Sequence, residues 1–148
     1  MRFIASNQLG YSFKESLLRA LAEYNLGLWK ERNGCSNRYT EEHKKDAWVR
    51  VYTLLGIAVG SEIYSKFYNC NEYLDYRDSL LNACEKVFVG QHLYGAENEA
   101  FKTFVKWVCV GTNFTPESVR QMMHISQYAY CLKERGVWKD EYAYKQYA

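Results

Sequence analysis

Residues 113–136, "NFTPESVRQMMHISQYAYCLKERG", carry the clearest helix signals in the chain. Thr115 is a typical N-cap, Pro116 suits the first helical position, and Glu117 complements the positive end of the helix dipole. Gly136 follows two basic residues and is typical of the position just beyond a helix. The stretch therefore predicts one continuous helix over residues 116–135.

Similar signals recur outward along the chain and predict an all-α fold. Nine glycines and a single proline leave few helix breakers in 148 residues, and no shift in composition suggests a linker. We expect one domain over residues 1–148, a bundle of five to six helices, with a short strand or arm at the N-terminal "RFIAS". The expected helices span residues 12–32, 40–60, 71–89, 96–110 and 116–135, and the tyrosine-rich tail over 137–148 would add a short sixth.

The run "LLGIAVG" at residues 54–60 is apolar on all sides of a helix. A helical segment of this kind is usually buried. We therefore expect the helix over about 41–60 to be the centre of the bundle. Gly56 and Gly60 lie four residues apart on one side, which would let another helix approach closely.

Composition and charge limit the classes of function. Hydrophobic residues make up 48% and charged residues 24%, as in ordinary globular domains. The net charge of +2 gives no strong indication of nucleic-acid binding. We find no signal sequence and no membrane-spanning run. Five cysteines without a C-x-x-C pair suggest free thiols in a reducing cytoplasm, or in the host cytoplasm if the chain is viral.

One face of the predicted helix over 116–135 is a candidate contact surface. A helical wheel places His124 on its polar side, away from the apolar residues, so we expect a surface histidine. The face offers varied hydrogen-bond donors and acceptors. No carboxylate lies three or four residues from His124 to orient its ring as a general base, which argues against catalysis. The candidate binding residues on this face are Glu117, Arg120, Gln121, His124, Gln127 and Tyr128.

Arg77 is a second anomaly, because it falls in the middle of the apolar face predicted for residues 71–89. An arginine there must form an ion pair, extend its head to solvent, or meet a ligand or partner. Glu97, in the first turn of the next helix, is the candidate for an internal pair. His92 and Tyr94 lie in the connecting loop, where binding residues often occur.

Motifs for metal, phosphate or nucleophilic chemistry are missing from the sequence. There is no repeated Glu-x-x-His pattern on facing helices, no phosphate-binding glycine loop, no G-x-S-x-G and no H-E-x-x-H. We therefore expect no metal, no cofactor and no enzymatic activity.

These observations favour a small cytoplasmic, non-enzymatic protein-interaction module. By analogy with other small, tyrosine-rich chains without motifs, it would be a phage- or mobile-element-type accessory protein or inhibitor that occupies a host protein. One alternative is a nucleic-acid-binding module that uses the helix over 116–135 and the basic group at 38–50. Another is a nucleotide- or small-molecule-binding protein with Arg77 as the anion anchor. We expect no membrane partner, and the sequence leaves homo-oligomer formation open.

Overall fold

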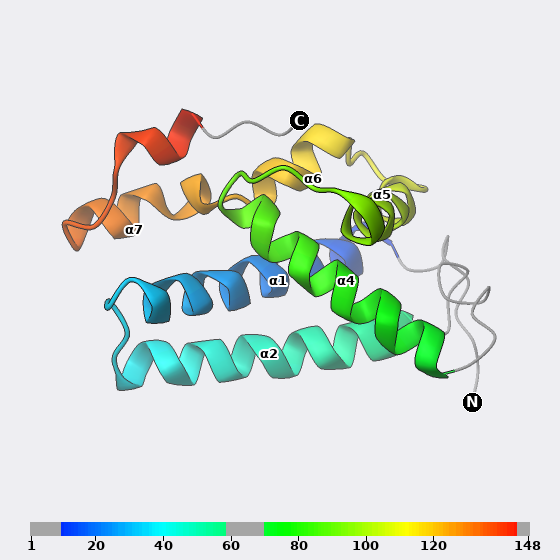
Figure 1. The fold of residues 1–148 in the computed structure, drawn as a ribbon, viewed down its shortest axis with the longest axis horizontal. Helices are drawn as coiled ribbons and strands as arrows, with labels where there is room; N and C mark the ends of the chain where they lie inside the picture. The colour runs from blue at the N-terminus through cyan, green and yellow to red at the C-terminus, as the bar shows by residue number, and fades with distance from the viewer. Residues whose placement is uncertain (1–9, 59–69, 145–148) are drawn as a thin grey trace.

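The computed structural model describes residues 10–58 and 70–144, and these ranges are helical and contain no strand (Figure 1). The prediction of an all-α bundle is confirmed. The expected N-terminal strand or arm lies outside the described residues. The elements are α1 (Tyr11–Arg32), α2 (Arg38–Ala58), α4 (Cys70–Phe88), α5 (Gly95–Cys109), α6 (Pro116–Met122), the 3-10 helix η2 (Ile125–Tyr128), α7 (Ala129–Glu134) and the 3-10 helix η3 (Asp140–Tyr144).

Helices α1 and α2 form an antiparallel hairpin along one side of the molecule (Figure 1). The turn begins where Gly34 adopts a φ of +69°, a conformation that glycine reaches without strain. The close approach of the two helices occurs at Gly27, because a Cβ there would lie 2.6 Å from Cγ of Lys44. Gly56, which we expected at a helix crossing, is exposed with no atom near its Cβ position.

The prediction that the helix over 41–60 is the centre of the bundle is wrong for its described residues, which end at Ala58. Helix α2 buries about one residue per turn, and Val49 and Tyr52 are 61% and 63% exposed. Helix α1 is the central element instead, since Leu17, Leu18 and Ala20 are fully buried on different sides of it. An all-round apolar stretch thus ended on the surface, because no described element covers its outer face.

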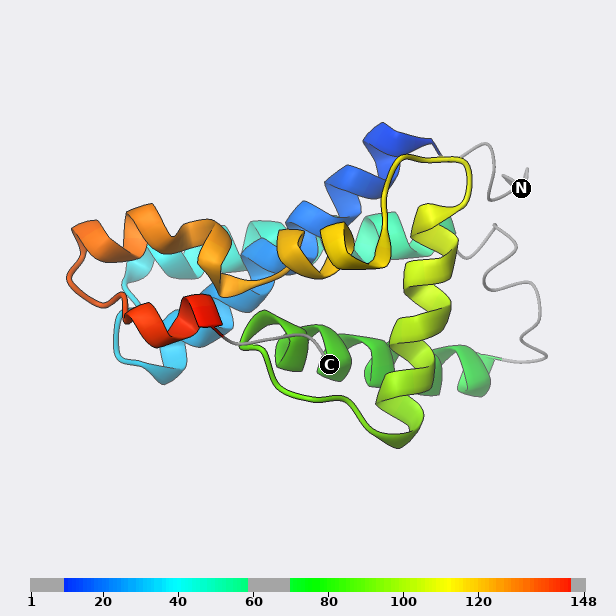
Figure 2. The ribbon, with the colours of Figure 1, turned by 90° about the horizontal axis from the view of Figure 1, so that it is seen from above.

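Two clusters of apolar side chains form the interior. The larger one joins α1 and α2 to α4, α5 and α6, with Phe101 and Phe104 of α5 fully buried in it. Helix α6 lies along α1, while α5 runs across α4 (Figure 2). The smaller cluster lies near the end of α1 and consists of Trp29, Phe88, Ile125 and Leu132.

The single helix predicted over 116–135 is broken. Its start is confirmed: Ser118 N donates to Thr115 Oγ1 at 3.1 Å, and Thr115 N donates to Ser118 Oγ at 2.8 Å. Helix α6 then ends at Met122, and His124 adopts an extended conformation with φ −89° and ψ 146°. Three consecutive residues, 123–125, are buried, which a straight helix on the surface cannot achieve. The break lets the segment reach both apolar clusters.

Candidate functional site

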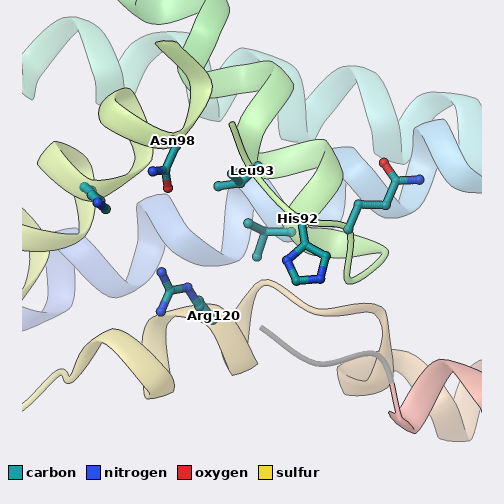
Figure 3. Close-up of a pocket in the computed structure, with 7 residues that line it drawn as sticks. His92, Leu93, Asn98 and Arg120 are labelled. Carbon is teal, nitrogen blue, oxygen red and sulfur yellow. The ribbon is translucent and has the colours of Figure 1, made fainter. Parts of the chain in front are cut away.

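Two adjoining hollows lie between α5, α6 and the loop over residues 89–94. A polar hollow of about 370 Å³ is lined by Val87, Gln91, His92, Leu93, Asn98, Lys102 and Arg120 (Figure 3). An apolar hollow of about 510 Å³ is lined by Lys102, Val105, Lys106, Cys109, Val110, Pro116 and Arg120. Because Lys102 and Arg120 line both, we treat the two hollows as one feature, the α5–α6 groove. Both volumes fall in the range of ligand sites in proteins.

The amphipathic pattern of α5 positions one wall of the groove. Phe101, Phe104 and Val108 hold the inner face of α5 in the core. Lys102 and Lys106 are four residues apart and therefore lie one above the other on the exposed side. This arrangement places two ammonium groups along one edge of the apolar hollow.

Arg120 forms the opposite wall from α6. Burial of Val119 beside it fixes the direction of this short helix. The Arg120 guanidinium lies 5.7 Å from the centre of the Phe101 ring, a cation–π contact across the helix junction. In Figure 3 the side chains of Asn98 and Arg120 point toward the same space from opposite sides. The planar guanidinium keeps its N–H donors available to a bound group in that space.

The electrostatics of the α5–α6 groove are one-sided. Among the described residues, Lys102, Lys106 and Arg120 form no ion pair, and no carboxylate lines either hollow. The nearest acid of α5 with a defined partner, Glu97, binds Lys86 instead, with 2.6 Å between Oε1 and Nζ. The site therefore combines an apolar floor with uncompensated positive charge.

The structure brings together only part of the predicted contact surface. His92 and Arg120 line the polar hollow, whereas Tyr94 lies beside it, 73% exposed, with its ring 6.3 Å from that of His92. Glu117 is exposed at the first turn of α6. The remaining polar residues of the predicted face do not join the groove: Gln121 and Gln127 are exposed, and Tyr128 is half-buried.

His124 is buried, with 1% of its surface exposed, so its expected place on a solvent-facing polar side is wrong. Its Nδ1 accepts a hydrogen bond from Ser126 N at 3.2 Å and lies 2.8 Å from Ser126 Oγ. The ring thus caps η2 at the break in the chain. Burial lowers the pKa of His124 below its usual value, which favours a neutral ring.

Arg77 and Glu97 do not form the internal ion pair that we considered. Arg77 lies 3.6 Å from its neighbour Asp78, and Glu97 is bound to Lys86. The side chain of Arg77 is 26% exposed, which corresponds to the alternative in which it extends its head toward solvent. It lines neither hollow of the α5–α6 groove.

The sequence analysis missed Lys14, the largest fully buried side chain of α1. Its Nζ donates to Trp107 O at 2.8 Å and to Val110 O at 2.9 Å, and it lies 4.8 Å from the centre of the Trp107 indole ring. A cation at the C-terminal end of a helix satisfies carbonyls that lack helical partners. Burial lowers the pKa of Lys14. The only signal in the sequence was its place beside Phe13 and one turn before Leu17 and Leu18.

Metal and membrane sites were also considered within residues 10–58 and 70–144. No group of three or more metal-binding side chains occurs there, and the four cysteines in this part are free. None of the described helices has the length and apolar character needed to cross a membrane.

Comparison of the chain with protein-family models, with curated proteins and with solved structures found no match. The functional argument therefore rests on the residues of this chain.

Proposed function

We propose that the protein is a non-enzymatic, cytoplasmic binding module that acts by occupying a partner protein through its α5–α6 groove. The observation that carries the proposal is the apolar hollow between α5 and α6 with three unpaired cations at its edge. An open apolar surface with polar groups around it is typical of sites that become buried by a partner. The role of accessory protein or inhibitor is the finer part of this proposal and rests on composition.

The nucleic-acid alternative has less support from the same contacts. In the basic group at 38–50, Lys44 pairs with Glu31 and Glu41, and Arg50 pairs with Glu23. This group also belongs to α2, whereas residues 116–135 lie on the other side of α1 (Figure 1). A phosphate backbone needs a continuous basic stripe, and these two segments do not form one.

The experiment is size-exclusion chromatography with light scattering, performed on the purified protein alone and after incubation with host lysate. Wild type is compared with the double variant Lys102→Glu/Lys106→Glu, in which both changed side chains are exposed. We expect a discrete protein to co-elute with wild type and to be absent, or reduced about tenfold, with the double variant.

The matched control is Lys45→Glu/Lys133→Glu, which makes the same change in charge at exposed positions on α2 and α7. It should retain the partner. Equal retention by all three proteins would place the interface elsewhere, and elution of wild type without any partner would contradict the proposal.

A further inference from the structure

Resting on the proposed function, we infer that the α5–α6 groove takes a short acidic segment of the partner protein. One apolar side chain of that segment enters the hollow between the two helices. Carboxylates before and after it bind Lys102, Lys106 and Arg120. The occupant is thus a peptide stretch of mixed acidic and apolar residues.

Charge complementarity is the first support. Lys102 and Lys106 stand on one side of the apolar hollow and Arg120 on the other, so a segment lying between them meets positive charge on both flanks. No carboxylate of the described residues lines the groove to neutralise them. Arg120 can hold a carboxylate through two parallel hydrogen bonds, with Asn98 facing the same space (Figure 3).

The floor supplies the second support. Between the cations the lining consists of Val105, Cys109, Val110 and Pro116, with no polar side chain other than the thiol. Such a surface binds an aliphatic or aromatic side chain and excludes a second charge. Alternation of acid and apolar groups in the ligand would match the alternation of cations and apolar floor in the groove.

The length of the groove fits a peptide segment. From Asn98 to Cys109, which line opposite ends, α5 advances by about 16 Å at 1.5 Å per residue. An extended peptide covers this distance in about five residues. Both hollows are open to solvent along it, so the segment can pass through without a free end.

A nucleic acid fits the same surface less well. Three cations are few compared with the six to ten phosphate contacts, roughly, of typical DNA-binding proteins. Glu117 is exposed in the first turn of α6, directly after Pro116 in the groove, and would repel a phosphate chain. No Phe, Tyr or Trp side chain lines either hollow to stack on bases.

The test is a selection from a random twelve-residue peptide display library on immobilised wild-type protein. The same library is selected on Lys102→Glu/Lys106→Glu and on the control Lys45→Glu/Lys133→Glu. We expect peptides enriched on wild type and the control, but not on the groove variant, to carry Asp or Glu on both sides of Leu, Ile, Phe or Trp. Circular dichroism checks that each variant is folded, and Arg120→Gln provides a second groove variant without charge reversal.

The outcomes separate the inference from the proposed function. Groove-dependent peptides without acidic residues would overturn the inference and leave the proposed function standing. Enrichment that ignores both groove variants, or no enrichment at all, would contradict both.

Direct binding then defines the ligand chemistry. For a selected peptide, replacing Asp and Glu by Asn and Gln should weaken binding about tenfold or more, and replacing the apolar residue by Ser should do the same. Binding should also weaken as salt is raised, because the charges lie at the surface. Dodecanoate or single-stranded DNA that binds the groove more tightly than every selected peptide would overturn the peptide assignment.

Discussion

The cations of the α1–α2 hairpin and those of the α5–α6 groove are the same residue types in opposite surroundings. In the hairpin, Lys44 lies 2.8 Å from Glu31 of α1, and Arg50 reaches Glu23 of α1. In the groove, Lys102 and Lys106 face an apolar hollow with no acidic partner among the described residues.

This difference separates charges that stabilise the fold from charges available to a ligand. A cation that bridges two helices has its field used within the molecule. A cation without a partner repels its like-charged neighbours and gains nothing from folding, so its benefit must come from outside. Lys14 is the extreme case of the first kind, since it is buried and bonded to two carbonyls.

The largest effect should follow from Lys14→Met. The change leaves Trp107 O and Val110 O without a buried donor, and we expect a loss of about 2 kcal/mol in the free energy of unfolding. Urea denaturation measures it. Arg19→Met, on the exposed side of the same helix, is the control and should change stability by less than about 0.5 kcal/mol. Equal losses would mean that the desolvation of Lys14 cancels its hydrogen bonds.

A smaller effect should distinguish two glycines of the hairpin. Gly27→Ala places a Cβ 2.6 Å from Cγ of Lys44, and overpacking of this kind costs about 1–3 kcal/mol against a gain in helix propensity of ~1 kcal/mol. Gly56→Ala meets no atom and should stabilise by up to ~1 kcal/mol. Thermal melting of both variants should therefore shift in opposite directions. If Gly27→Ala also raised the melting temperature, α1 and α2 would not be in close contact at this point.

The smallest effect compares the charges themselves. Lys44→Ala should lower stability by at most about 1 kcal/mol, and the loss should shrink in high salt because the pair with Glu31 is partly exposed. Lys106→Ala should leave stability within about 0.5 kcal/mol of wild type at any salt concentration. Denaturation at 50 mM and 500 mM salt measures both. A salt-dependent loss for Lys106→Ala would reveal an ion pair and contradict the assignment of this lysine to ligand binding.

Local sequence signals predicted the start and end points of most helices. Thr115 and Pro116 begin α6 as expected, and Gly34, Gly90 and Gly136 follow helices with positive φ angles. These features depend on hydrogen bonds and backbone conformation within a few residues of each other. The all-α class follows from the same signals.

The candidate site was predicted only in part, for a related reason. Arg120 and His92 were identified as polar residues on a helix and a loop, and both line the α5–α6 groove. Lys102 and Lys106 looked like any solvated face of a helix, because nothing in the sequence of α5 shows that α6 and Pro116 form the opposite wall.

The sequence by itself therefore determined the helical class, the helix termini and the absence of familiar catalytic motifs. Tertiary structure decided that α1 rather than α2 is central, that the chain breaks at His124, and that Lys14 is buried while Lys102 is not. A hydrophobic pattern records which side of a helix can be buried. Which distant element arrives to cover that side depends on the packing of the whole chain.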